Sequence, residues 1–275
     1  MMNVESEDEI VLFVKLGYDG HSLGACHQSQ RVNMLSRLKA TAQVMPSPRV
    51  VPVNTAKPPK EFSDLDLRLR LPVLHIILAT ETDGLEPLDS SDDIVVALES
   101  KYPGGLCACS SQCEAEADQA SRDFFSKFCF LVRGVAKESS HLESELQTLD
   151  KFLQDSSGER GEGGFLCGSS PSLLDCEILP KLHQVRVAAQ ALKGYSIPAH
   201  FSALWRYLYA AYSCPAFTES CPPDHEIILH WLEHCGTPEA MKQSRKLLSQ
   251  IGSERHQPSY SFSIPAKATP VVIDD

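Results

Sequence analysis

The sequence predicts a two-domain protein, with a small α/β domain over residues 10–102 followed by an all-helical domain over residues 103–235. Three observations support this fold class. Short apolar runs typical of strands alternate with helix-like segments in the first hundred residues. After Tyr102-Pro103-Gly104-Gly105, apolar residues follow helical spacing up to about residue 235. A chain of 275 residues is also long enough for two ordinary domains.

Three strands are predicted in the first domain. The apolar run Ile10–Val14 is rich in β-branched and aromatic residues, which suits a buried strand. Residues 50–53 offer a second short strand after several prolines. Residues 71–78 form a third strand-like run, with Pro72 at its start, where a strand tolerates proline.

Two helices are predicted between and after these strands. One opens near Gly24 and is amphipathic. Its apolar stripe contains Val32, Leu35 and Leu38, and its opposite face carries Arg31, Arg37 and Lys39. The other follows a turn within residues 85–100, with Ser90 or Ser91 as its N-cap and aspartates in its first turn.

The second domain is predicted to contain only helices. Residues 118–135 and 140–154 form two helical segments, followed by a Gly- and Ser-rich loop over 156–164. The clearest helix begins at Ser172, with Asp175 three residues on as in a capping box, and Pro180 inside it predicts a kink. Further helices are expected over 204–212 and 227–234.

Both ends of the chain read as polar. Residues 1–9 are expected to form a flexible tail. Residues 236–275 are expected to hold a weak helix starting at Thr237-Pro238, then a disordered segment over 252–275.

Composition restricts the function. A formal charge of −11 argues against a nucleic-acid partner. The acidic N-terminus lacks the features of a secretory signal, and no run of 18 apolar residues occurs. The ten cysteines are therefore expected to be reduced thiols in a cytoplasmic protein.

Three stretches resemble the chloride intracellular channel family over roughly residues 10–235. The first runs from Phe13 to Arg31 and contains Asp19-Gly20 and Gly24-Ala25-Cys26. The second contains Phe165-Leu166-Cys167-Gly168 and Leu179-Pro180-Lys181-Leu182-His183. The third runs from Ile197-Pro198 through Leu204-Trp205-Arg206-Tyr207 to Ser220-Cys221-Pro222, and is closest to invertebrate members. The resemblance implies a glutathione-transferase-like fold, in which a thioredoxin-like domain precedes a helical one.

Cys26 is the candidate catalytic residue. It lies at the predicted N-terminus of the first helix, where unpaired backbone N–H groups and the helix dipole favour a thiolate. Such a thiolate attacks disulfides or forms a mixed disulfide with glutathione. Ser29 occupies the place of a resolving thiol, which implies monothiol chemistry of the glutaredoxin type with glutathione or protein thiols as partners.

The resemblance also implies glutathione-binding residues. Pro72 resembles the cis-proline that faces the active cysteine in thioredoxin-like folds, where it would expose the backbone of Val73 to glutathione. Ser90 and Ser91 match the helix N-terminus that holds the γ-glutamyl carboxylate. Asp89, Asp92 and Asp93 crowd that helix start with negative charge, so an ordinary N-cap is the alternative role.

Two departures from the family bear on function. His27 replaces the usual proline after the cysteine. Its side chain is expected to point to solvent, and the alternative is a protonated imidazole that lowers the pKa of the Cys26 thiol. The family is proposed to insert the segment after the cysteine into membranes as an anion-conducting span. Residues 26–45 contain three basic side chains, each costing about 2.5–3.5 kcal/mol at a bilayer centre, so only a self-associated form with an aqueous pore would accept them.

The sequence leaves three functions open: a glutathione-linked thiol oxidoreductase, a membrane-associating chloride channel, and a catalytically silent scaffold that binds partner proteins. Whether the chain is an enzyme is undecided from the sequence.

Cys107, Cys109 and Cys113 are interpreted as an accessible, redox-sensitive thiol cluster and not a metal site. His230 and His234, with Cys235 adjacent, are interpreted as surface residues without a metal.

Overall fold

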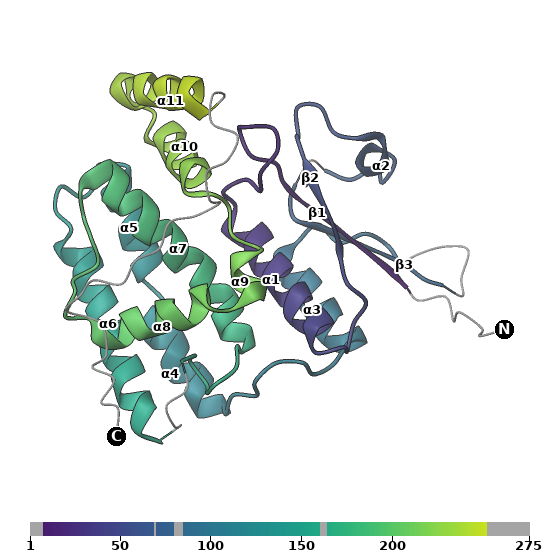
Figure 1. The fold of residues 1–275 in the computed structure, drawn as a ribbon, viewed down its shortest axis with the longest axis horizontal. Helices are drawn as coiled ribbons and strands as arrows, with labels where there is room; N and C mark the ends of the chain where they lie inside the picture. The colour runs from purple at the N-terminus through teal and green to yellow at the C-terminus, as the bar shows by residue number, and fades with distance from the viewer. Residues whose placement is uncertain (1–7, 69, 80–84, 160–163, 252–275) are drawn as a thin grey trace.

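A computed structural model of the chain describes residues 8–68, 70–79, 85–159 and 164–251. Its sheet has three strands in the order β2-β1-β3. The central strand β1 (Glu9–Lys15) pairs in parallel with β2 (Arg49–Val53) and antiparallel with β3 (Val73–Ile77). Figure 1 shows the sheet on the right of the molecule and most helices on the left. The three predicted strands are therefore present, with slightly different limits.

Strand β1 is buried on both faces, which explains why its sequence is a continuous apolar run and not an alternating one. Ile10, Leu12 and Val14 face the main core of the molecule. Val11 and Phe13 face a smaller cluster, which also contains Phe62 from the short helix α2 (Lys60–Ser63). The Phe13 and Phe62 rings meet edge to face with their centroids 5.3 Å apart.

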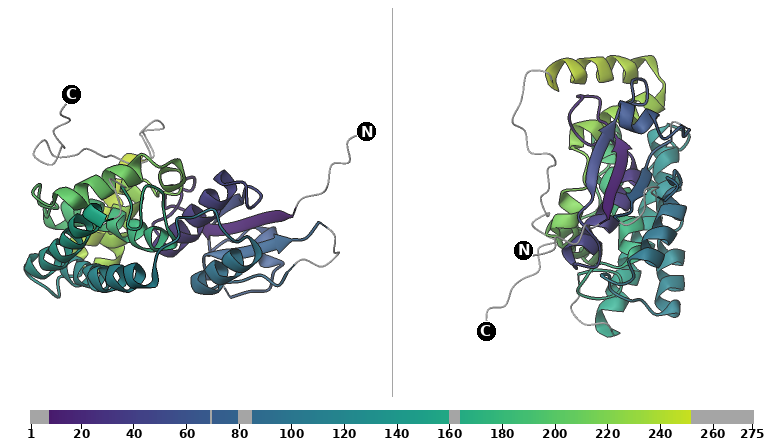
Figure 2. Two further views of the ribbon diagram at one scale, coloured as in Figure 1. Left: turned by 90° about the horizontal axis from the view of Figure 1, so that it is seen from below. Right: turned by 90° about the vertical axis from the view of Figure 1, so that its right-hand side faces the viewer.

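The main core joins the sheet to the helices without a break. Helix α1 (His27–Thr41) contacts β1, α3 (Ser91–Lys101) and α7 (Leu173–Lys193), so it lies between the sheet and the helical part of the chain. The left view of Figure 2 shows the strands on one side and the helical part on the other. This placement makes α1 a shared element of both parts.

The helical part is built around α7. Its N-terminus has the predicted capping box, in which the Ser172 hydroxyl accepts from Asp175 N–H and the Asp175 carboxylate accepts from Ser172 N–H. Pro180 lies inside the helix as expected. The remaining helices are α4 (Ser111–Ser121), α5 (Phe124–Val132), α6 (Ser140–Glu159), α8 (Ser202–Tyr212), α9 (Pro215–Thr218), α10 (Asp224–Cys235) and α11 (Pro238–Ile251).

Several predicted boundaries are wrong. The single helix predicted over 118–135 is two helices, because the turn at Arg122 and Asp123 separates α4 from α5. Helix α6 continues to Glu159, into the segment predicted as a loop. Strand β1 begins at Glu9, within the predicted flexible tail. The predicted disorder over 252–275 lies outside the described residues.

Candidate functional site at the start of α1

Cys26 is the N-cap of α1, as the sequence predicts. Its backbone is extended, with φ −132° and ψ 108°, and its Sγ accepts a hydrogen bond from the backbone N–H of Ser29 at 3.4 Å. The side chain is half-buried. Sulfur thus occupies the position where a capping oxygen normally satisfies one of the unpaired N–H groups of a helix start.

The loop that delivers Cys26 to this position passes very close to β1. Gly24 N–H donates to the carbonyl of Lys15 at 2.7 Å. A Cβ on Gly24 would lie 2.6 Å from the Leu16 carbonyl oxygen, which is too close for any side chain. The glycine two residues before the cysteine is therefore required by this backbone approach.

The predicted glutathione-binding residues gather at the same end of the sheet. Val73 pairs with Phe13, so β3 begins beside the carboxyl end of β1, from which the chain leads to Cys26. The Leu71–Pro72 bond is cis, which confirms that prediction. Leu88 bridges Leu74, so the chain reaches the start of α3 at this end as well. The structure thus brings together the elements carrying Cys26, Pro72, Val73, Ser90 and Ser91, whose binding roles stay predictions.

Ser90 is the N-cap of α3, and its hydroxyl accepts from Asp93 N–H at 3.4 Å. Ser91, the first helical residue, is buried. The negative charge expected here is partly offset, because Arg31 of α1 forms ion pairs with Asp92 at 2.6 Å and with Glu177 of α7 at 2.7 Å. Arg31 therefore links the α1 thiol region to the start of α3 and to α7.

His27 does not point to solvent, contrary to the prediction. Its ring packs on Phe125 of α5, with the centroids 5.0 Å apart, and Phe125 in turn contacts Trp231. Burial lowers the pKa of His27 to about 4, with Lys181 and Arg31 adding to the effect. The imidazole is neutral at pH 7, so it supplies no positive charge to the neighbouring thiol.

The basic side chains of α1 were predicted to form its polar face, but each is paired with another element. Lys39 is fully buried, ion-paired with Glu99 at 2.9 Å, and donates to the carbonyls of Tyr102 and Gly104. Arg37 is ion-paired with Glu219 beside α9. Helix α1 also buries polar residues, namely Ser29, Gln30, Asn33 and Ser36. The helix is enclosed rather than amphipathic, because the helical part covers the face that the sequence assigns to solvent.

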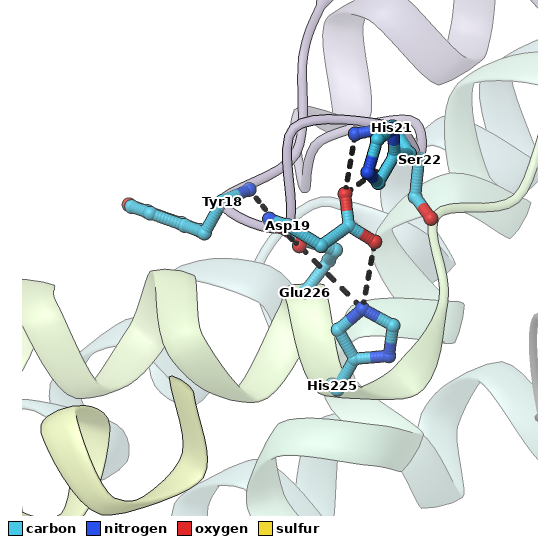
Figure 3. Close-up of polar contacts among 6 residues, drawn as sticks. All are labelled: Tyr18, Asp19, His21, Ser22, His225 and Glu226. Carbon is cyan, nitrogen blue, oxygen red and sulfur yellow. Dashed lines mark hydrogen bonds and ion pairs between the residues drawn. The ribbon is translucent and has the colours of Figure 1, made fainter. Parts of the chain in front are cut away.

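A group of residues whose association the sequence did not indicate holds the turn after β1 against α10 (Figure 3). The buried Glu226 carboxylate accepts from the backbone N–H groups of Tyr18 at 2.8 Å and Asp19 at 3.0 Å. His225 lies 3.2 Å from the Asp19 carboxylate. We call this group, Tyr18, Asp19, His225 and Glu226, the α10 latch. Residues over two hundred positions apart form it, so no local pattern reveals it.

The α10 latch contains two carboxylates and one imidazole, and the pKa values of Asp19 and His225 are shifted by their neighbours. Burial alone would raise the pKa of Asp19, but hydrogen bonds from Ser22, His21 and His225 lower it to about 2. Hydrogen bonding to Glu226 and to Asp19 raises the pKa of His225, against the opposing effect of burial. The latch therefore favours an imidazolium between two carboxylates, and it fixes the turn that precedes Cys26.

The cysteine cluster differs from the prediction. Cys109 and Cys167 form a disulfide that spans 58 residues, so the expectation of ten reduced thiols is wrong. Cys113 is buried, and its Sγ lies 3.5 Å from that of Cys167. The cluster therefore includes a residue from the loop before α7, which the spacing within residues 107–113 did not indicate.

The histidines of α10 also differ from the prediction in part. His234 is exposed, but His230 is half-buried, and its Nδ1 accepts from Lys15 Nζ at 3.3 Å. Burial lowers the pKa of His230 to about 3, with Lys15 adding to the effect. Cys235 Sγ donates to the Val132 carbonyl at 3.2 Å. The contacts of His230 and Cys235 join α10 to β1 and to α5.

Within the described ranges, no helix combines the length and apolarity needed to cross a bilayer.

The chain matches no protein-family model. A chloride intracellular channel protein of Caenorhabditis elegans (exl-1) is 35% identical over 211 residues, covering 77% of this chain and 80% of that protein.

Solved structures agree on the fold. The chloride intracellular channel homologue EXC-4 of C. elegans has a TM-score of 0.71 at 22% identity, covering 96% of this chain and 91% of that one. The dehydroascorbate reductase of Chlamydomonas reinhardtii has a TM-score of 0.64 at 24% identity, covering 82% of this chain and 98% of that one. The fold is that of the glutathione transferases, and the sequence identity to exl-1 shows that the chain belongs to the chloride intracellular channel family.

Proposed function

We propose that the protein catalyses glutathione-dependent thiol–disulfide exchange at Cys26. The observation that carries the proposal is the position of Cys26 as the N-cap of α1, with its half-buried Sγ accepting from Ser29 N–H at 3.4 Å. The N-cap position places the sulfur against the unpaired backbone N–H groups of the first helical turn, and its half-burial leaves it accessible to a disulfide. The start of β3 at the same end of the sheet, where Val73 pairs with Phe13, and a dehydroascorbate reductase among proteins of this fold support it.

The chemistry needs one cysteine and two successive displacements. In the first, Cys26 Sγ attacks the glutathione sulfur of a protein–glutathione disulfide, and the protein leaves as a thiolate that takes up a proton. In the second, the Cys26–glutathione disulfide is attacked by a second glutathione thiolate, which restores Cys26 and forms oxidised glutathione. Ser29 offers no sulfur for an internal disulfide at this helix start, so the resolving thiol comes from glutathione.

The residues around Cys26 fit glutathione in most respects. The backbone of Val73 follows cis-Pro72 and would pair with the cysteinyl part. The first turn of α3, at Ser90 and Ser91, supplies N–H groups for the γ-glutamyl carboxylate. Its two acidic residues oppose that carboxylate, but Arg31 offsets the charge of Asp92. We therefore expect weak glutathione binding that is sensitive to Arg31.

The test measures reduction of a glutathionylated peptide by glutathione, with glutathione reductase and NADPH reporting the oxidised glutathione formed. Wild type is expected to show turnover that Cys26→Ser abolishes. Cys129→Ser is the matched control, because Cys129 is also half-buried but lies in α5, where burial raises the pKa of its thiol. Absence of turnover in wild type, or turnover retained in Cys26→Ser, would falsify the proposal.

Failure of this assay would favour the scaffold function, in which the helical part binds partner proteins and Cys26 is an inert cap. A pull-down with the Cys26→Ser variant then separates the two, because a scaffold keeps its partners without the thiol. Mixed-disulfide partners would be lost under reducing conditions.

Membrane association and chloride conduction are the functions that the family name adds. In this fold, moving α1 into lipid breaks the ion pairs of Arg31 with Asp92 and Glu177, of Arg37 with Glu219 and of Lys39 with Glu99. We expect thiol exchange to proceed without lipid. Chloride efflux from liposomes, compared between wild type and an Arg37→Glu variant, tests conduction separately.

A further inference from the structure

Three cysteine sulfurs from two distant parts of the chain meet beside the start of α4. The Sγ atoms of Cys109, Cys113 and Cys167 all lie within 4.8 Å of one another. Cys113 is buried, whereas Cys109 and Cys167 are half-buried. The cluster lies in the helical part, on α4 and the loops before α4 and α7, and it plays no part in the proposed chemistry at Cys26.

Local structure holds two of these sulfurs in place on elements fixed by other contacts. The Ser110 hydroxyl caps α4 by accepting from Cys113 N–H at 3.2 Å, which sets Cys113 in the first turn. Cys167 lies in a tight turn closed by a hydrogen bond from Phe165 N–H to the Gly168 carbonyl. Leu166, inside that turn, donates its N–H to the buried Asp175 carboxylate at 3.2 Å. The α7 capping motif therefore positions Cys167 opposite Cys113.

The spacing of one sulfur pair, Cys113 and Cys167, suits a tetrahedral metal. Two thiolates bound about 2.3 Å from one zinc ion at the tetrahedral angle lie about 3.8 Å apart. Cys113 Sγ and Cys167 Sγ are 3.5 Å apart, close to that value. Thiolate sulfur is the ligand type that selects zinc over magnesium or calcium.

We propose that these three cysteines, once reduced, bind one Zn²⁺, and that the Cys109–Cys167 disulfide is the oxidised, metal-free form of the same site. The fourth coordination position faces solvent, because Cys109 and Cys167 are half-exposed, and a water molecule takes it. Cys107 remains outside the site, with its Sγ directed at the Cys167 carbonyl at 3.5 Å. Metal binding would join the first turn of α4, through Cys113, to the loop before α7, whereas the disulfide joins only the loops before α4 and α7.

The disulfide form is converted into the zinc form in two steps, reduction and then metal binding. Two molecules of a reducing thiol, such as glutathione, give two electrons and two protons to the Cys109–Cys167 disulfide, producing two cysteine thiols and one oxidised disulfide of the reductant. Zn²⁺ then binds the three sulfurs and releases the three protons of Cys109, Cys113 and Cys167. Oxidation by a small disulfide runs the sequence in reverse and releases the metal.

The experiment titrates Zn²⁺ into the full chain after reduction with a phosphine and removal of metals, in competition with a chromophoric chelator. Co²⁺ is the spectroscopic probe, because tetrahedral thiolate coordination gives intense visible and sulfur-to-metal charge-transfer bands. We expect one Zn²⁺ per reduced chain and none at this site in the oxidised chain. Replacing one ligand, in Cys109→Ser, Cys113→Ser or Cys167→Ser, should weaken binding about 100-fold or more, since losing even a residue that only orients a ligand costs about 10–100-fold.

Two control variants isolate the site. Cys26→Ser and Cys129→Ser should keep full Zn²⁺ binding, because neither residue belongs to the cluster. Far-ultraviolet circular dichroism checks that each variant folds, and Cys109→Ser carries the test if loss of the buried Cys113 disturbs α4. A reduced wild-type chain that binds no Zn²⁺, or a Cys109→Ser chain that binds it as tightly as wild type, overturns the proposal. Binding lost in Cys26→Ser would place the metal elsewhere and also overturn it.

Discussion

Replacement of Glu226 tests whether the α10 latch holds the turn that precedes Cys26. The fully buried Glu226 carboxylate accepts two backbone hydrogen bonds, from Tyr18 at 2.8 Å and from Asp19 at 3.0 Å. A hydrogen bond to a charged group contributes about 1.5–3 kcal/mol, so Glu226→Ala should lower the free energy of unfolding by about 3–6 kcal/mol. Glu226→Gln keeps one oxygen acceptor and should lose about half of that, or about 1.5–3 kcal/mol.

The assay combines two measurements at pH 7. Urea unfolding gives the change in free energy, and hydrogen exchange with mass spectrometry reports the protection of the Tyr18 and Asp19 amides. Both amides should exchange faster in Glu226→Ala, with the peptides of β2 little affected. The matched control is Glu219→Gln, whose side chain is 58% exposed and ion-paired with Arg37, and whose cost should be about 0–1 kcal/mol.

A role of the latch in holding this turn is refuted if Glu226→Ala and Glu219→Gln lower the unfolding free energy equally, or if the amides of Tyr18 and Asp19 keep their protection in Glu226→Ala. Either result would mean that the turn is held by its own hydrogen bonds and not by α10. The latch would then have no influence on the loop leading to Cys26.

Glu226 and Asp19 raise the pKa of His225. Its contribution to stability is therefore full below the unfolded pKa of about 6.5 and is lost as pH rises through the higher folded pKa. The difference in unfolding free energy between wild type and His225→Gln should accordingly shrink as pH rises above about 6.5. A difference that grows with pH in urea unfolding would contradict the ion pair. Gly24→Ala places a Cβ 2.6 Å from the Leu16 carbonyl oxygen, so it should lower the free energy of unfolding by about 1–3 kcal/mol and slow the alkylation of Cys26 by iodoacetamide. Unchanged stability and alkylation would refute the close approach. Lys39→Met leaves the Glu99 carboxylate and two carbonyls without their buried ammonium, so it should lower the free energy of unfolding in urea by about 3–5 kcal/mol. The control Arg122→Met breaks an exposed ion pair and should leave the free energy of unfolding unchanged. Equal effects of these two would show that burial of Lys39 is not what stabilises it.

The sequence predicted those elements whose formation depends on residues that are neighbours in the chain. The apolar run Ile10–Val14 became β1, the Ser172–Asp175 capping box began α7, and the cysteine at the helix start became the N-cap of α1. In each case the residues that determine the structure are neighbours in the chain, so their spacing is visible in the sequence.

The features that the sequence did not predict depend on contacts between residues far apart in the chain. Lys39 was assigned to a solvent-facing stripe, but its partners Glu99 and Gly104 lie about sixty residues away and enclose it. The disulfide joins Cys109 to Cys167 across 58 residues, and Glu226 meets Tyr18 across 208. Periodicity along one helix reports only which residues share a face, not what covers that face.

The burial of Lys39 has a consequence for dividing the chain. Its ammonium donates to the carbonyls of Tyr102 and Gly104, and these acceptors stand on either side of the predicted domain border at 102 and 103. A recombinant fragment that stops at residue 102 therefore cuts between them and removes one of the two carbonyl acceptors of a buried ammonium. The border that composition suggests is a poor place for an expression limit, and a self-sufficient thiol-bearing fragment must extend at least through Gly104.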